Sequence, residues 1–183
     1  VSTLAFNSDE PILYVGGGFL QIGGVNRNRI AAIDTSNMSI TDWNPNADSN
    51  VYDLSVSHND ELVYAAGLFL NIGGRDQRYL AALDTSLNSN QATTWAPKIT
   101  RQPYELAASS ISSKVNVVGY FKHLGAEVNQ VQYLARFSRS TGALIPTGFE
   151  PNGQVYGLKY SSQKNQLYIG SSFTKINDIS IVF

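Results

Sequence analysis

Short apolar stretches alternate with polar positions along the whole chain. In one of them Tyr52, Leu54 and Val56 alternate with Asp53 and Ser55, and this period of two predicts a β-strand with one face buried. Clusters of Asn, Asp, Ser and Gly separate such stretches, and these residue types favour tight turns. No window keeps the period of about 3.6 residues that a helix requires. The sequence therefore predicts an all-β protein that is nearly free of helix.

The apolar stretches recur in a repeat. The segment 14–24, YVGGGFLQIGG, returns at 64–74 as YAAGLFLNIGG. Each unit carries four such stretches, and four strands in about 50 residues are typical of a blade of a β-propeller. One phenylalanine marks each copy at intervals of 50 to 52 residues, at Phe19, Phe69, Phe121 and Phe173.

The repeat predicts a single β-propeller segment over residues 1–183. We expect its blades at about 1–50, 51–102, 103–154 and 155–183, the last of them incomplete. Three full units and part of a fourth do not obviously close a ring. We therefore expect a partial propeller, completed by the rest of a longer chain or by other copies in a homo-oligomer.

Within this repeat the chain resembles a known family. The motifs YVGGGF at 14–19, RIAAIDTS at 29–36 and WNP at 43–45 are similar to the delta-sixty repeats of bacterial cell-surface propellers, which run YVGGxFTxIGGxxRNxIAAxD, then WNP and VxAL. Repeats of the fungal cortical proteins of the Rax type are similar too. The resemblance covers essentially the whole chain. It implies a β-propeller fold, an extracellular or cell-surface location and no defined catalytic site.

Composition excludes several classes of function. The net charge is -1 and only 15% of the residues are charged, against about 25% in an average soluble domain, so nothing attracts the chain to nucleic acid. The absence of cysteine removes disulfides, zinc-thiolate sites and cysteine nucleophiles. No apolar run is long enough to span a membrane. We expect no cofactor and no metal, although acidic residues in turns leave metal-stabilised blades open.

Charged side chains gather on one set of predicted loops. The loops after the second and fourth strands of each blade emerge on one face of a propeller. That face could bind carboxylates, sulfates or phosphates. Alternatively, its arginines brace the loops by donating to backbone carbonyls. Its charged residues are Arg27, Arg29, Asp48, Arg75, Asp76, Arg78, Lys98 and Arg101.

Two repeated acids are expected in turns. Asp34 and Asp84 each precede Thr-Ser at a predicted hairpin, where a carboxylate caps the turn through nearby backbone. Ser138 takes this place in the third unit. A capping role is favoured over metal ligation or acid-base chemistry.

Repeated apolar residues are expected in the core. Aromatic residues recur near each fourth strand, where packing at the outer part of the blade is favoured over a carbohydrate platform. The leucine of each innermost strand should be buried as well. These residues are Trp43, Trp95 and Phe149, with Leu4, Leu54, Leu106 and Leu158.

No catalytic constellation stands out. His58 and His123 are the only histidines, and no Gly-x-Ser-x-Gly elbow accompanies them. The glycines at 16–18 lack the third glycine and the helix of a dinucleotide loop. The first hypothesis is a non-enzymatic scaffold outside the cell or on its surface that binds a protein or glycan partner. The alternative is a propeller hydrolase or lyase acting on polysaccharide, with its catalytic residues mostly outside this segment.

Overall fold

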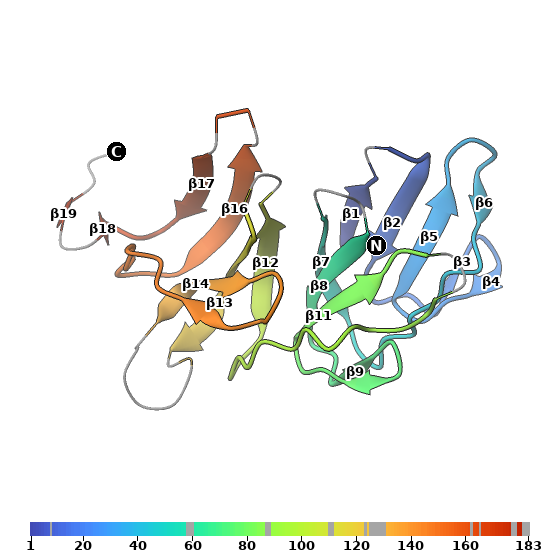
Figure 1. The fold of residues 1–183 in the computed structure, drawn as a ribbon, viewed down its shortest axis with the longest axis horizontal. Coiled ribbons are helices and arrows are strands. Elements are labelled where there is room, and N and C mark those ends of the chain that lie inside the picture. The colour runs from blue at the N-terminus through green and yellow to red at the C-terminus, as the bar shows by residue number, and fades with distance from the viewer. Residues whose placement is uncertain are drawn as a thin grey trace.

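The computed structural model describes residues 1–7, 9–57, 61–86, 89–109, 112–122, 124, 131–161, 163–164, 166–176 and 179–180. Every regular element in these ranges is a β-strand, and the strands form antiparallel sheets that follow one another in chain order (Figure 1). The same ranges contain no helix that could cross a bilayer. The prediction of an all-β chain is confirmed for the described residues.

The first three sheets share one topology, in which the chain runs outward from an inner strand. The first sheet contains β1 (Thr3–Phe6), β2 (Ile12–Gly16), β5 (Ile30–Asp34) and β6 (Ser39–Ile40). The second contains β7 (Val51–Val56), β8 (Leu62–Gly67) and β11 (Leu80–Asp84), with a single bridge from Leu83 to Ala92 in the place of a fourth strand. The third contains β12 (Pro103–Ala108), β13 (Lys114–Lys122), β14 (Gln132–Ser138) and β15 (Leu144–Ile145).

The fourth sheet pairs β16 (Val155–Ser161) with β17 (Gln166–Ser171). Small hairpins follow the second strand of the first, second and fourth sheets. They are β3 (Gln21–Ile22) with β4 (Val25–Asn26), β9 (Asn71–Ile72) with β10 (Arg75–Asp76), and β18 (Lys175–Ile176) with β19 (Ile179–Ser180).

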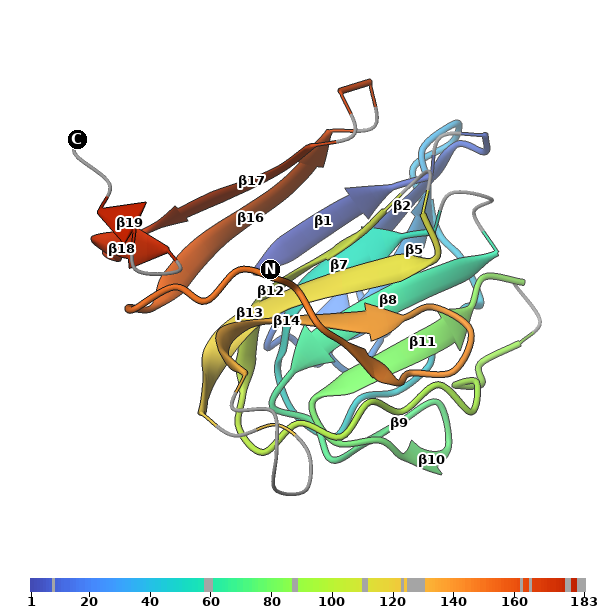
Figure 2. The same cartoon turned by 60° about the vertical axis from the view of Figure 1, so that its left-hand side comes forward.

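The innermost strands of the sheets lie side by side. Strand β7 contacts β1 on one side and β12 on the other, and β12 in turn contacts β16 (Figure 2). The sheets therefore fan out from a common inner edge, which is the arrangement that the repeat predicts.

The hydrophobic core lies between consecutive sheets. Successive side chains of a strand point to opposite faces, so a second strand such as β8 serves two junctions. Val63 and Ala65 pack against the first sheet, whereas Tyr64 and Ala66 pack against the third. A smaller cluster that contains Leu134 and Phe173 joins the third and fourth sheets.

The innermost leucines follow this arrangement with one exception. Leu54, Leu106 and Leu158 are 5%, 3% and 8% exposed and pack against the preceding sheet, which confirms their predicted burial. Leu4 is 60% exposed, and its predicted burial is wrong. It occupies the same strand position, but it belongs to none of the hydrophobic clusters that lie between consecutive sheets. Phe19 is half-buried, whereas Phe69, Phe121 and Phe173 are buried.

Three equivalent residues adopt a backbone conformation that is rare for a side chain larger than glycine. Arg29, Tyr79 and Tyr133 have φ angles of 66°, 72° and 62°, and each stands at the start of the third strand of its sheet. A non-glycine residue in this region is uncommon. Its recurrence at one place in three units marks it as part of the repeat's geometry.

A series of hydrogen bonds links neighbouring inner strands. Leu106 N donates to Asp53 Oδ2 at 2.8 Å, and Leu158 N donates to Glu105 Oε2. Thr3 Oγ1 accepts from Leu54 N at 3.3 Å in the equivalent place of the first junction. Each inner strand lies at the edge of its sheet, so its outward-pointing backbone N–H groups have no partner strand within that sheet. A side chain of the preceding sheet accepts a hydrogen bond from one of these N–H groups.

A register shift precedes the acceptor in two of these strands. It lies between Val51 and Asp53 in β7 and between Pro103 and Glu105 in β12. A bulge re-aims the side chain beside it. We infer that the bulge turns each carboxylate toward the following sheet.

The carboxyl group of Asp53 makes stability depend on pH. Burial raises its pKa to about 6, hydrogen bonds from Leu106 N and Thr3 oppose the rise, and the charge of Glu105 adds to it. When the pKa of a group is higher in the folded state than in the unfolded state, the group stabilises the fold fully at pH values below its unfolded pKa. This stabilisation is lost as the pH rises through its folded-state pKa. We expect this group to lower the free energy of unfolding by up to about 3 kcal/mol between about pH 4 and pH 7.

Urea unfolding at several pH values would measure this loss against Asp53→Asn. The amide oxygen of asparagine keeps an acceptor for Leu106 N but does not titrate in this range. The variant should therefore lose this part of the pH dependence. Parallel stability curves for the two proteins would contradict the assignment.

Candidate functional site

The predicted loop arginines mostly brace their own sheets. Arg27 donates to Asn26 O at 2.8 Å and to Thr41 O at 2.6 Å. Arg29 donates to Ala47 O at 2.9 Å, and Arg75 donates to Ala92 O at 2.8 Å. These contacts match the alternative in which arginines fasten loops through backbone carbonyls.

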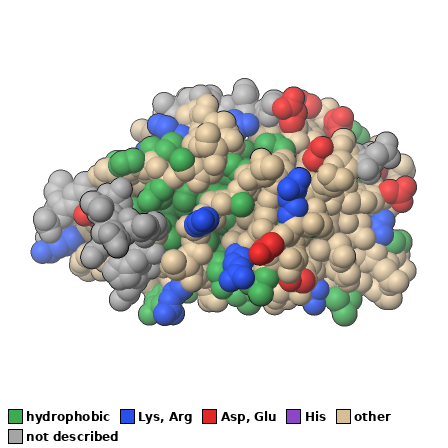
Figure 3. All heavy atoms as spheres, turned by 60° about the horizontal axis from the view of Figure 1, so that its bottom comes forward, with side chains coloured by type: hydrophobic (Ala, Val, Ile, Leu, Met, Phe, Trp, Pro, Cys, Tyr) green, Lys and Arg blue, Asp and Glu red, His purple; other side chains and the backbone are tan. Residues whose placement is uncertain are grey.

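The other charged loop residues do not form one continuous positive patch with these arginines. Asp76 and Arg78 form an exposed ion pair at 3.6 Å, and with Lys98 they line a shallow hollow of about 360 Å³. Arg101 lies over the ring of Tyr120 at 5.8 Å. Lys and Arg side chains form separate spots in the face seen in Figure 3, with acidic side chains among them.

Asp48 joins two sheets. Its carboxylate accepts hydrogen bonds from Leu70 N and from both the backbone and the side chain of Asn71. Burial alone would raise the pKa of Asp48, but these hydrogen bonds outweigh it and lower the pKa. The acid thus secures the hairpin of the following sheet.

The repeated turn acids take the places expected of them. Asp34 accepts from the backbone and hydroxyl of Ser36, and Asp84 accepts from Ser86 N. These hydrogen bonds hold the pKa of both carboxyls below the usual value. Among the described residues, no group of three or more acids or histidines could hold a metal ion. His58, His123 and the loop 125–130 lie outside the described residues.

A tryptophan clamps each of the first two junctions. Trp43 Nε1 donates to Asp84 O at 2.7 Å, and Trp95 Nε1 donates to Ser138 O at 2.8 Å. Each indole also packs edge-on against a tyrosine of its own sheet, Tyr14 or Tyr64, with ring centroids 5.0 Å apart. Both tryptophans are buried, as expected for packing residues.

The third sheet departs from this pattern. Phe149 stands in the tryptophan position, because its backbone N–H donates to Thr147 as those of Trp43 and Trp95 donate to Thr41 and Thr93. Phe149 is 50% exposed, so its predicted packing role is wrong. Phenylalanine has no indole N–H, so it cannot form the clamp.

The change extends over part of the face of the third sheet that points to the fourth, while Val118 and Leu134 on that face stay apolar and buried. Strand register identifies the equivalent positions in the three sheets. Apolar residues in the first two sheets are replaced by polar ones in the third. The series are Ile12, Leu62 and Lys114; Tyr14, Tyr64 and Asn116; and Ala32, Ala82 and Arg136.

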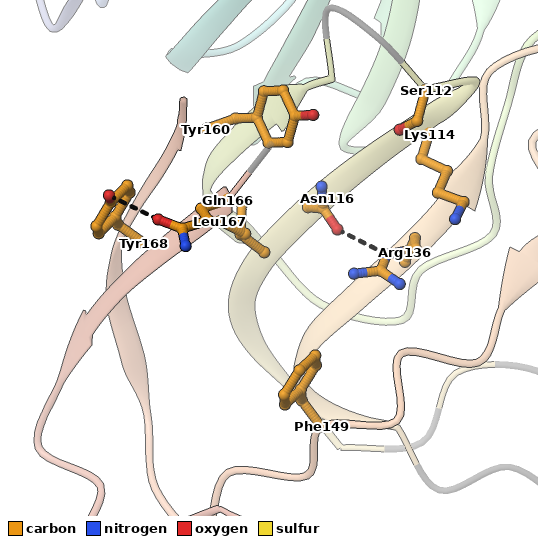
Figure 4. A pocket seen from close by; sticks show the side chains of 9 residues that line it. All are labelled: Ser112, Lys114, Asn116, Arg136, Phe149, Tyr160, Gln166, Leu167 and Tyr168. Carbon is orange, nitrogen blue, oxygen red and sulfur yellow. Dashed lines mark hydrogen bonds between the residues drawn. The ribbon is translucent and has the colours of Figure 1, made fainter. Parts of the chain in front are cut away.

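These substitutions coincide with a hollow of about 580 Å³ between the third and fourth sheets. Figure 4 shows the side chains of β13 and β14 on one side of it and those of β16 and β17 on the other. Its lining residues are Ser112, Lys114, Asn116, Arg136, Phe149, Tyr160, Gln166, Leu167 and Tyr168.

The hollow is electropositive. It contains two cations, Lys114 and Arg136, and no carboxylate. The one ion pair found among the described residues lies elsewhere, between Arg78 and Asp76. Asn116 is only 4% exposed, and its Oδ1 accepts from Arg136 Nε at 3.0 Å, which fixes the guanidinium. The arrangement can bind an anion, and it offers no acid-base pair.

Comparison with solved structures identifies the architecture. The chain matches the β-propeller domain of Cps50 (Swd1) from Myceliophteria thermophila with a TM-score of 0.57 and 12% identity, over 98% of this chain and 51% of that one. The fold is a β-propeller. Each sheet is accordingly a blade, and the predicted fold class is confirmed.

A second solved structure also matches the chain. Hydrazine synthase from Kuenenia stuttgartiensis matches with a TM-score of 0.59 and 10% identity, over 92% of this chain and 41% of that one. The chain spans about half of these relatives' length or less. No family model and no curated protein matches the sequence. At these identities the likeness concerns the fold alone.

Sequence reasoning missed the hollow, although one signal was present. Placing the third unit on the first two sets Arg136 against two alanines. A charged residue at a core position is costly unless it has a partner. That substitution alone would have pointed to the face between the third and fourth blades.

Proposed function

We propose that this chain is a non-enzymatic propeller scaffold outside the cell or on its surface, and that it binds a protein or glycan partner. The observation that carries the proposal is the hollow over the third blade, where the repeat changes from apolar to cationic. A propeller supplies a rigid frame, and departures from the repeat supply specific contacts. The extracellular location rests on the sequence resemblance.

The lining of the hollow favours binding over catalysis. Hydrolysis of a glycoside by the usual route needs a pair of carboxylates, and the hollow has none. Its volume lies within the range of about 300 to 1,000 Å³ that is typical of ligand sites. Lys114 and Arg136 would attract an acidic group of the partner.

The test is binding of purified chain to defined panels of glycans and synthetic peptides. Lys114→Leu with Arg136→Ala restores the residues of the second blade, Leu62 and Ala82, and should weaken binding of the selected partner at least about 10-fold. Arg78→Ala is the control, because it removes a cation outside the hollow. Absence of binding in both panels, or equal loss in variant and control, would refute the proposal.

A further inference from the structure

We propose that the hollow between the third and fourth blades binds an acidic sugar residue of a glycan chain, with the sugar carboxylate held by Arg136. The inference deepens the proposed function and rests on it. It names the partner as a glycan and the recognised group as a carboxylate.

The first argument is the geometry of Arg136. Its Nε is engaged by Asn116 Oδ1 at 3.0 Å, and Asn116 is itself almost completely buried. No hydrogen bond within the described residues uses its two Nη groups. Such a fixed planar fork matches the two oxygens of a carboxylate.

The second argument is that an apolar covering, as found at the first two junctions, does not suit Arg136. At the first two junctions the equivalent alanines, Ala32 and Ala82, are fully buried in clusters that also contain apolar residues of the next blade. The same covering over Arg136 would desolvate an unpaired guanidinium, which is costly. An anionic occupant that pairs with the guanidinium offsets that cost. Lys114, two residues before Asn116 on β13 and therefore on the same face, adds a second positive charge.

The third argument is the distribution of the aromatic rings. Phe149, Tyr160 and Tyr168 stand on separate sides of the hollow in Figure 4. Phe149 is 50% exposed and Tyr168 is 48% exposed, so both offer apolar surface to a ligand. Rings set apart do not form the parallel slot that would stack a nucleotide base. They suit the C–H faces of a puckered sugar, whose hydroxyls could meet Ser112 and Gln166.

The experiment is calorimetric titration of the chain with a four-residue oligogalacturonate at low salt. The neutral galactose oligomer of the same length is the matched ligand. We expect the acidic oligomer to bind and the neutral one to bind at least about 10-fold more weakly. Raising the salt concentration should weaken binding of the acidic oligomer, because exposed charges are screened.

Variants locate the site. Arg136→Ala should lower affinity at least about 10-fold, and Arg136→Lys should lie between it and the original chain, because lysine keeps the charge but loses the planar fork. Arg78→Ala should leave affinity unchanged. Alanine is the residue of the first two blades at this position, and urea unfolding of Arg136→Ala checks that the fold is kept.

Two further probes separate the inference from the proposed function. An acidic peptide that binds through Arg136 while oligogalacturonate does not would overturn the inference and leave a protein partner in place. A sulfated glycan that binds more tightly than the carboxylated one would also overturn it. If neither glycan nor peptide binds, both the inference and the proposed function fail.

Discussion

Replacing Trp43 by alanine is expected to lower the free energy of unfolding by about 3 to 5 kcal/mol. The indole is fully buried between the first two blades, packs against Tyr14 and donates to Asp84 O. Alanine would leave a cavity and would remove the hydrogen bond to a partly buried carbonyl group, and each carries its own cost. Urea unfolding measured by circular dichroism would give the change directly.

Trp43→Phe is the matched control for this substitution. Phenylalanine retains most of the packing but has no N–H group, so the expected loss is about 1 to 3 kcal/mol from the unsatisfied carbonyl together with the smaller ring. The third blade carries a phenylalanine at this position naturally, as Phe149. Equal losses for the two variants would show that packing contributes little, and no loss for either would refute the clamp.

A pair of leucines provides the second large contrast. Leu54→Ala should cost about 2 to 5 kcal/mol, because the side chain is 5% exposed in the cluster between the first two blades. Leu4→Ala removes the same atoms from the same strand position of the first blade. Leu4 is 60% exposed in this chain, so the expected cost is within about 0.5 kcal/mol.

Unfolding of both variants under identical conditions tests the contrast. The two substitutions remove the same atoms, so the difference between their losses of unfolding free energy measures the contribution of packing against a neighbouring blade. Similar losses would show that Leu4 is covered in solution, for instance by another copy of the chain. Similar small effects would contradict the assigned core.

Strand positions were predictable because their cause is local. The alternation around Leu54 is visible in the sequence and corresponds to β7 in the structure. The repeat then carries the same strand into the later units, and three of the four marker phenylalanines, Phe69, Phe121 and Phe173, are buried. Leu4 was mispredicted because its burial depends on a neighbour, and the strand pattern contains no information about one.

The features of the candidate site depend on residues far apart in the chain. Trp43 bonds a carbonyl group 41 residues away, and the hollow joins β13 and β14 to β16 and β17. The positive φ angle shared by Arg29, Tyr79 and Tyr133 gave no signal, because these side chains are not the glycine or asparagine that usually marks it. Periodicity predicts the strands but not such long-range pairings.

The hydrogen bonds between inner strands all run in the same direction along the chain. Thr3, Asp53 and Glu105 each supply the acceptor, and the following blade supplies the backbone donor. Gly157 occupies the same register position in the fourth blade and has no side chain to continue the series. A chain made from its N-terminus therefore presents each acceptor before its donor is synthesised. Each of the first three blades thus offers a hydrogen-bond acceptor against which the inner strand of the next blade can dock, and the fourth blade offers none at this position.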